Sequence, residues 1–125
     1  MPSRTAYTIL AFGAVSLLTG IYILLSPESM LSMLSLPSAS LPSIRANASA
    51  AIAMGIYYTL AFVQDDRTFF AATIPIRMLT AAVLGMQGGA WLYVALWEGI
   101  GASFTGVILA LEGFQSRKIE GTKQY

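Results

Sequence analysis

The sequence predicts an all-α fold in which four transmembrane helices form an antiparallel bundle. Charged residues make up only 10% of the 125-residue chain, whereas a soluble globular domain carries about 25%. Three stretches contain no charge, Thr5 to Pro27, Ala46 to Gln64 and Met78 to Trp97, and they are 23, 19 and 20 residues long. About 20 apolar residues at a rise of 1.5 Å cross a hydrocarbon core of roughly 30 Å. We therefore expect one integral membrane domain over residues 1–125.

The first span is expected at residues 5–25. It ends before Pro27, because proline lacks an amide hydrogen and disfavours helix in the residue before it. Only Arg4 precedes the apolar run, and its end lacks a small-x-small cleavage pattern, which favours a retained span over a signal peptide. The segment 28–36 predicts a short interfacial helix between the first two spans, and 37–43 predicts a loop.

The remaining spans follow from the polar breaks between them. The second is expected at residues 44–63 and ends at the turn Gln64-Asp65-Asp66-Arg67, which is too polar for lipid. A glycine turn separates the third span, at 68–86, from the fourth, at 90–114. A charged tail, 115–125, completes the chain.

Basic residues predict the orientation of the bundle. Four spans put both termini on one side, and five Lys or Arg lie on that side, namely Arg4, Arg67, Arg117, Lys118 and Lys123. Only Arg45 lies beside a span end on the other side. The positive-inside rule therefore predicts cytoplasmic termini. We expect the endoplasmic reticulum or another endomembrane as the location.

The composition excludes several classes of function. The chain has no Cys and no His, so it lacks the usual ligands of zinc, haem and iron-sulfur sites and cannot supply a thiolate or an imidazole base. We therefore expect no metal and no cofactor. A net charge of +1 gives no electrostatic footprint for nucleic acid. The expected partners are the lipid bilayer and a lipophilic small molecule, and a homo-oligomer stays open.

Two charges lie inside predicted spans, where each costs about 2.5 to 3.5 kcal/mol. Arg77 is nine residues into the third span, about 13.5 Å deep, and Glu98 is eight residues into the fourth, about 12 Å from the opposite surface. Antiparallel neighbours would bring them to the same depth. We expect a functional pair, and the alternative interpretation is a buried bridge that only fixes helix register.

Polar side chains also share helical faces within each span. From the first span to the fourth, these faces hold Thr8, Thr19 and Tyr22; Asn47, Ala51, Met54 and Tyr58; Thr73, Arg77 and Thr80; and Trp91, Glu98, Thr105 and Glu112. If each face points inward, the bundle encloses a polar, hydrated cavity at mid-membrane.

The candidate catalytic residues are Glu98, Arg77, Asp65 and Asp66. Glu98 is assigned the role of general acid or base. Arg77 stays charged and cannot act as the acid, so its role would be orientation and electrostatics. Asp65 or Asp66 would activate water at the cytoplasmic mouth, although an acidic pair in a turn is also ordinary solvation.

The candidate substrate-binding residues are polar and aromatic groups of the three later spans, namely Arg45, Asn47, Tyr58, Thr73, Thr80, Trp97 and Thr105. Arg45 and Asn47 would roof the cavity and hold an oxygen, unless Arg45 only reaches to lipid headgroups. Their depth favours Tyr58 and Trp97 as cavity walls.

Five features together carry a resemblance to a known group of proteins. They are Leu-Leu-Ser-Pro-Glu at the end of the first span, the Pro/Ser-rich loop, Ile44-Arg45-Ala46-Asn47, Gln64-Asp65-Asp66-Arg67 and Trp97-Glu98-Gly99. Over residues 1–114 the chain resembles small four-span membrane proteins of unknown function common in fungi. Some are encoded beside polyketide and terpenoid biosynthetic enzymes, so the resemblance implies an epoxide hydrolase or cyclase acting on such products.

The leading hypothesis is a membrane-embedded, cofactor-independent hydrolase or isomerase/cyclase that acts by acid-base chemistry on a lipophilic secondary metabolite such as an epoxidised polyketide or terpenoid. Two other classes stay open. Small four-helix proton-coupled exporters have this length, but their carboxylate lies in the first span, which has no acid here. A non-enzymatic membrane partner subunit is the third class, since small residues in the second and fourth spans allow close packing.

Overall fold

The computed structural model describes residues 1–122. Its helices are α1 (Arg4–Leu25), α2 (Pro27–Met33), α3 (Leu41–Gln64), α4 (Arg67–Gln87) and α5 (Trp91–Thr122), with a 3-10 turn, η1 (Ser38–Ser40). Within these residues there is no strand, and four helices are long and apolar enough to cross a membrane. The all-α four-helix fold is therefore confirmed, and the chain is a multi-pass membrane protein.

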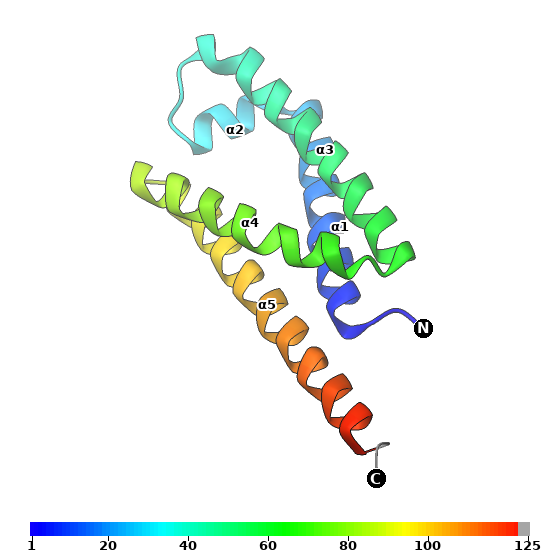
Figure 1. Cartoon of the computed structure of the whole chain (residues 1–125). Coiled ribbons are helices and arrows are strands. Elements are labelled where there is room, and N and C mark those ends of the chain that lie inside the picture. Colours follow the sequence, from blue (N-terminus) through cyan, green and yellow to red (C-terminus); the bar gives the residue numbers. More distant parts are fainter. Residues whose placement is uncertain (123–125) are drawn as a thin grey trace.

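The bundle consists of two helix pairs. α1 packs along α3, α4 packs along α5, and α5 also contacts α1 (Figure 1). The N-terminus of α1 and the C-terminal part of α5 lie at one end of the bundle, and α2 lies at the other. The structure thus agrees with the expectation that the two termini share a side.

Local side-chain contacts explain where the helices begin and end. The hydroxyl of Ser3 accepts a hydrogen bond from the amide of Ala6 and caps α1, because Ser satisfies amides that lack an intrahelical partner. Asp66 caps α4 in the same way, accepting from the amide of Phe69 at 3.0 Å. Asp65, at φ 49°, adopts the left-handed conformation that Asp tolerates. The acidic pair therefore forms the turn between α3 and α4.

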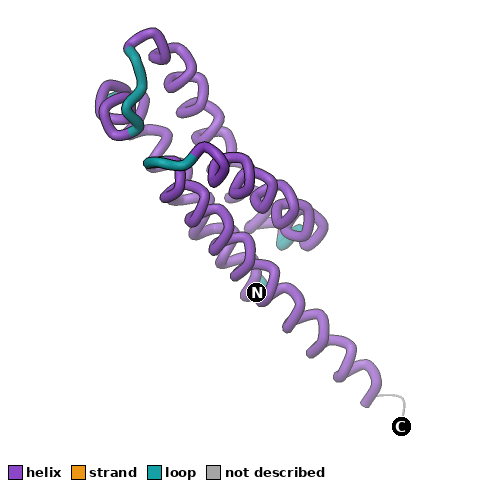
Figure 2. The backbone as a smooth tube through the Cα atoms, turned by 90° about the vertical axis from the view of Figure 1, so that its left-hand side faces the viewer, coloured by secondary structure: helices purple, strands orange, loops and turns teal. Residues whose placement is uncertain are grey.

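The predicted short helix between the first two spans is present as α2, but several predicted boundaries were wrong. α2 ends at Met33 and not at residue 36, and the predicted loop 37–43 contains η1 and the start of α3. α3 begins at Leu41, three residues before the predicted span, because Pro42 suits the first turn of a helix, where its missing amide hydrogen is not needed. α5 has 32 residues and continues to Thr122, since residues 115–122 contain no proline to stop it. At 1.5 Å per residue α5 is about 48 Å long, and its C-terminal part extends beyond the other helices (Figure 2). Residues 123–125 of the predicted tail lie outside the described residues.

Glycines set the close approach of α1 and α3. A Cβ atom added to Gly55 would lie 2.6 Å from the Cβ of Leu17 and 2.7 Å from the carbonyl oxygen of Gly13. The hydroxyl of Ser16 donates across this contact to the carbonyl of Ala51 at 2.9 Å. Close packing of small residues and interhelical hydrogen bonds hold membrane helices together without a hydrophobic driving force.

One buried hydrophobic cluster joins α1, α3 and the start of α4. It contains Ala6, Ile9, Phe12, Tyr58, Ala61 and Phe70. A second cluster packs α2 onto α1 and α3 at the opposite end.

Candidate functional site

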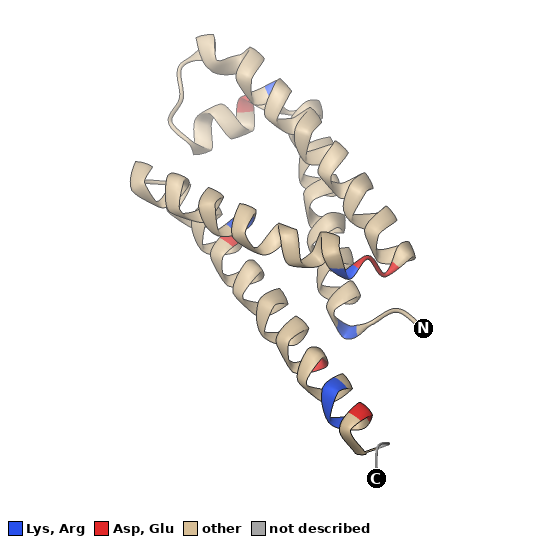
Figure 3. Cartoon of the chain, viewed as in Figure 1, with Lys and Arg blue, Asp and Glu red and all other residues tan. Residues whose placement is uncertain are grey.

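The two intramembrane charges meet. Arg77 is the central residue of α4, with ten helical residues on either side. Its Nε donates to Oε2 of Glu98 on α5 at 3.1 Å. Figure 3 shows that most Lys, Arg, Asp and Glu residues lie near the ends of the bundle. Arg77 is far from either end of α4, so its pair with Glu98 lies away from those ends. The prediction that antiparallel neighbours bring these residues to one depth is confirmed.

The Arg77 side chain is enclosed and only partly satisfied. It is 4% exposed, and its Cζ lies 3.5 Å from the centroid of the Phe12 ring, a cation–π contact. A Cβ atom added to Gly101 would collide with Nη2, so the absence of a side chain there makes room for the guanidinium. Nη2 is buried and, among the described residues, has no hydrogen-bond partner.

An unpartnered buried donor needs a physical explanation. Leaving such a group unsatisfied costs about 1–3 kcal/mol, and more when it is charged. Native proteins keep few of these groups, and those that persist are explained by strain, by a catalytic role, or by an ordered water or ion. Arg77 Nη2 is thus the strongest sign of a functional site in this bundle.

A partly open cavity of about 280 Å³ lies beside Arg77, between α1, α4 and α5. Its walls are Thr8, Ala11, Phe12, Arg77, Trp97, Ile100, Gly101, Phe104 and Thr105. Nearly all of the cavity surface is apolar, so the expectation of a polar, hydrated cavity was wrong. Apolar side chains from α1 (Ala11, Phe12) and α5 (Trp97, Ile100, Phe104) line the cavity together with three residues of the predicted polar faces, Thr8, Arg77 and Thr105. Glu98, which accepts from Nε of Arg77, does not line this cavity.

Two threonines form the polar contact at the α1–α5 wall. The Oγ1 atoms of Thr8 and Thr105 are 3.0 Å apart, and Thr8 Oγ1 also donates to the carbonyl of Thr5 at 2.7 Å. A hydroxyl has one hydrogen to donate, so Thr105 is the donor in the Thr8–Thr105 bond. Thr105 is 1% exposed, which places it inside the bundle as predicted.

The two predicted aromatic walls have different positions. Trp97 lines the cavity and stacks on Phe12, with ring centroids 5.6 Å apart, while 47% of it is exposed on the outer surface. Tyr58 is buried in the α1–α3–α4 core, where it contacts the rings of Phe12 and Phe69. Tyr58 therefore packs against Phe12, which lines the cavity, but Tyr58 itself does not line it.

The two threonines predicted beside Arg77 bond to their own helix. Thr73 is buried and donates to the carbonyl of Phe70 at 2.8 Å, and Thr80 donates to that of Ile76 at 3.1 Å. Neither lines the cavity. Their hydroxyl hydrogens are satisfied within α4, so the structure does not bring them into the site.

Arg45 and Asn47 lie away from the site. Both are exposed on α3 near the end of the bundle that holds α2. The buried face of α3 contains Ile44, Ala48 and Gly55. The expectation that Asn47 points inward was wrong, because the close approach to α1 favours small residues over polar ones. The same reason leaves Thr19 and Tyr22 exposed on α1.

Asp65 and Asp66 lie at the end of the bundle that holds the termini. Besides forming the α3–α4 turn, Asp65 accepts hydrogen bonds from the hydroxyl of Ser3 at 2.6 Å and from its amide at 3.3 Å. Asp66 is about 16 Å along α4 from Arg77 at the rise of a helix. The structure therefore places neither carboxylate beside the Arg77–Glu98 pair.

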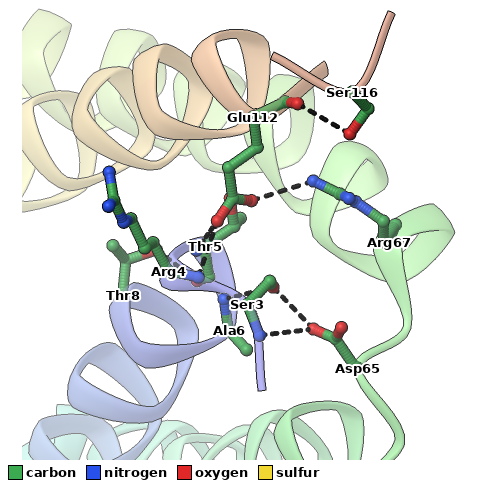
Figure 4. Close-up of polar contacts among 9 residues, drawn as sticks. All are labelled: Ser3, Arg4, Thr5, Ala6, Thr8, Asp65, Arg67, Glu112 and Ser116. Carbon is green, nitrogen blue, oxygen red and sulfur yellow. Dashed lines mark hydrogen bonds and ion pairs between the residues drawn. The ribbon is translucent and has the colours of Figure 1, made fainter. Parts of the chain in front are cut away.

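Glu112 holds the N-terminus of α1 against α4 and α5, a role that sequence reasoning missed. Its carboxylate accepts from the amides of Arg4 and Thr5, at 2.6 and 3.3 Å, and from the Thr5 hydroxyl at 2.6 Å. Arg67 Nη2 completes the contact at 2.8 Å (Figure 4). A carboxylate is favoured at a helix N-terminus by free amides and the helix dipole. The seven-residue spacing of Glu98, Thr105 and Glu112 was the available signal.

Comparisons with protein-family models, with curated proteins and with solved structures find no significant match for this chain. The resemblance to fungal four-span proteins therefore stays a prediction, and the functional argument rests on the cavity beside Arg77.

Proposed function

We propose that this protein is a membrane-embedded, cofactor-independent enzyme of the hydrolase or isomerase/cyclase type, acting on a lipophilic molecule that carries an oxygen atom. The observation that carries the proposal is that Arg77, whose Nη2 is buried and unpartnered among residues 1–122, belongs to the lining of an apolar cavity of about 280 Å³. Apolar walls with a few oriented polar groups are typical of small-molecule sites.

Arg77 would stabilise charge that develops on the substrate oxygen. A preorganised donor in a site of low dielectric constant is worth far more than the same donor in water. Arg77 remains protonated, so it donates a hydrogen bond without giving up its proton. The same contact would stabilise an enolate in an isomerisation or the alkoxide of an opening epoxide.

Glu98 would hold Arg77 in place and exchange a proton with the substrate. Oε2 accepts from Nε of Arg77, and no hydrogen bond within residues 1–122 occupies Oε1. In an isomerisation, Oε1 would take a proton from the carbon beside a carbonyl and return it to another carbon, which leaves the composition unchanged. In an epoxide hydrolysis it would take a proton from the water whose oxygen bonds to one ring carbon, and return that proton to the alkoxide oxygen released when the ring C–O bond breaks, so that one water is added in total. Because Glu98 does not line the cavity, its proton role needs a test separate from its holding role.

The substrate would reach the cavity sideways from the bilayer. Three wall residues, Trp97, Ile100 and Phe104, are also exposed on the outer face of α5, at 47%, 67% and 59%. This face would meet acyl chains in a membrane. A lipophilic molecule dissolved in the bilayer can therefore enter without crossing the polar ends of the bundle.

We further propose that the termini are cytoplasmic and that the end holding α2 faces the lumen of an endomembrane. Arg4 and Arg67 begin α1 and α4, and Arg117 and Lys118 lie in the C-terminal part of α5, whereas Arg45 lies near the start of α3 at the other end of the bundle. Reporter fusions at both ends test this orientation, and a lumenal C-terminus would refute it.

The activity is tested with purified protein in lipid nanodiscs, without a gradient. The probes are lipophilic epoxides and β,γ-unsaturated ketones, and products are identified by mass spectrometry and absorbance. Wild-type protein should add one water to an epoxide or shift a double bond, and Arg77→Met should abolish turnover. Glu98→Gln should still bind but not turn over, because an amide oxygen can hold Arg77 but cannot take the proton. Thr80→Val, whose hydroxyl bonds only its own helix, is the control. Equal rates in wild type and both site variants would refute the catalytic roles. Efflux from sealed proteoliposomes that depends on a proton gradient would favour an exporter.

A further inference from the structure

The charge balance around the cavity constrains what can bind there. Among residues 1–122, Arg77 is the only charged residue in the cavity wall, and its Nε lies 3.1 Å from Oε2 of Glu98. The next acidic residue along α5 is Glu112, about 21 Å away at the rise of a helix, and it is engaged at the end of the bundle. The polar centre of the site therefore has one positive and one negative charge.

A neutral centre in low dielectric disfavours a charged ligand. An ionised carboxylate entering the cavity would lose its hydration and leave one net negative charge in the hydrocarbon region. A neutral carbonyl, epoxide or ether oxygen can accept the hydrogen bond from Nη2 without adding charge. The carboxylate and the neutral oxygen would both accept a hydrogen bond from Nη2. Only the neutral oxygen leaves the net charge of the site at zero.

We propose, building on the function proposed above, that the cavity selects neutral lipophiles with a hydrogen-bond acceptor oxygen and rejects the corresponding carboxylates. Glu98 is then the specificity-determining residue, because it cancels the charge that would attract an anion. The cavity volume of about 280 Å³ is just below the usual range of roughly 300–1,000 Å³ for ligand sites. It accommodates the oxygen-bearing end of a ligand, and an apolar remainder would lie against Ile100 and Phe104 in the bilayer.

Trp97 provides an internal probe, because it lines the cavity and the chain has only one other tryptophan, Trp91. The ligands are a medium-chain methyl ketone, the carboxylate with the same chain and the alkane, each brominated at the same position to quench tryptophan fluorescence. Trp91→Phe protein in nanodiscs reports Trp97 alone, and Trp97→Phe reports the background from Trp91. We expect the ketone to quench at roughly tenfold lower concentration than the carboxylate or the alkane, which corresponds to 1.4 kcal/mol.

Two variants in the Trp91→Phe background separate charge from shape. Glu98→Gln leaves Arg77 with an uncompensated positive charge, so the carboxylate should become the tighter ligand. Gly101→Ala keeps both charges but displaces Nη2, so the ketone should lose its advantage over the alkane. Thr80→Val should behave like wild type.

The outcomes distinguish this inference from the function on which it depends. A wild-type preference for the carboxylate over the ketone would overturn the inference while leaving an oxygen-binding site in place. Identical quenching by ketone, carboxylate and alkane in wild type would refute the binding site and with it the proposed function. The wild-type comparison needs no variant, so it decides the question even if Glu98→Gln fails to fold.

Discussion

Breaking the Arg77–Glu98 pair should destabilise the bundle far more than breaking an exposed ion pair would. Two unit charges 3.1 Å apart attract each other by about 5 kcal/mol at an effective dielectric constant of roughly 20. Removing one partner of a buried pair typically costs about 3–5 kcal/mol, because the other charge is left uncompensated. Glu98→Gln and Arg77→Met should each lower the free energy of unfolding by about that amount. The double variant should recover much of the loss, with a coupling energy of about 3 kcal/mol.

The assay is a double-mutant cycle of reversible unfolding in detergent-lipid bicelles, followed by circular dichroism. The Arg67–Glu112 pair is a matched control in the same chain, because the Arg67 side chain is 46% exposed and pairs of this kind are worth about 0–1 kcal/mol. Polar contacts in membrane proteins average only about 0.6 kcal/mol in such cycles. A coupling energy below about 1 kcal/mol, or one equal to that of the control pair, would show that Arg77 and Glu98 do not form a buried pair in the membrane.

Three other perturbations test the packing around the site. Gly55→Ala places a Cβ atom 2.6 Å from that of Leu17, so the free energy of unfolding should fall by about 1–3 kcal/mol. An unchanged free energy would mean that α1 and α3 are farther apart. Glu112→Gln weakens charge-assisted bonds worth about 1.5–3 kcal/mol, so amide exchange at Arg4 should rise at least tenfold by NMR; equal protection would refute the contact. Thr105→Val removes a single hydroxyl bond and should cost only about 0.6 kcal/mol, whereas a loss above about 2 kcal/mol would indicate a larger network.

The number of helices and their approximate limits could be predicted because bilayer thickness sets a length that the uncharged runs match. The central ion pair followed from the same geometry, since residue counts fix depth along a straight helix. The continuation of α5 past residue 114 was missed because charged residues indicate where a span leaves the lipid but do not end the helix. A helix stops at proline, at glycine or at a cap, and residues 115–122 contain neither proline nor glycine before Gly121.

Helix rotation could not be predicted from polarity. Asn47, Thr19 and Tyr22 were expected to point inward, but they are exposed. Gly55 and its neighbours on α1 determine which faces meet, because the closest approach of two helices requires small residues. Threonine hydroxyls can bond carbonyls of their own helix, as in Thr80, so they tolerate a lipid-facing position.

The character of the cavity depended on contacts between helices distant in sequence. Phe12 from α1 covers the guanidinium of Arg77 from α4, and Trp97 from α5 stacks on Phe12. None of these contacts follows from spacing along one helix. The sequence therefore indicated where the polar centre lies, and the structure shows that apolar rings enclose it.

The most direct test of the account is whether the free nitrogen of Arg77 holds the oxygen of a lipophile inside the membrane. Solid-state NMR in lipid bilayers can measure dipolar coupling between a ketone ligand labelled with ¹³C at its carbonyl and protein labelled with ¹⁵N at arginine. We predict a coupling at hydrogen-bonding range in wild-type protein that disappears in Arg77→Met. No coupling in wild type, or an equal coupling in Arg77→Met, would contradict it.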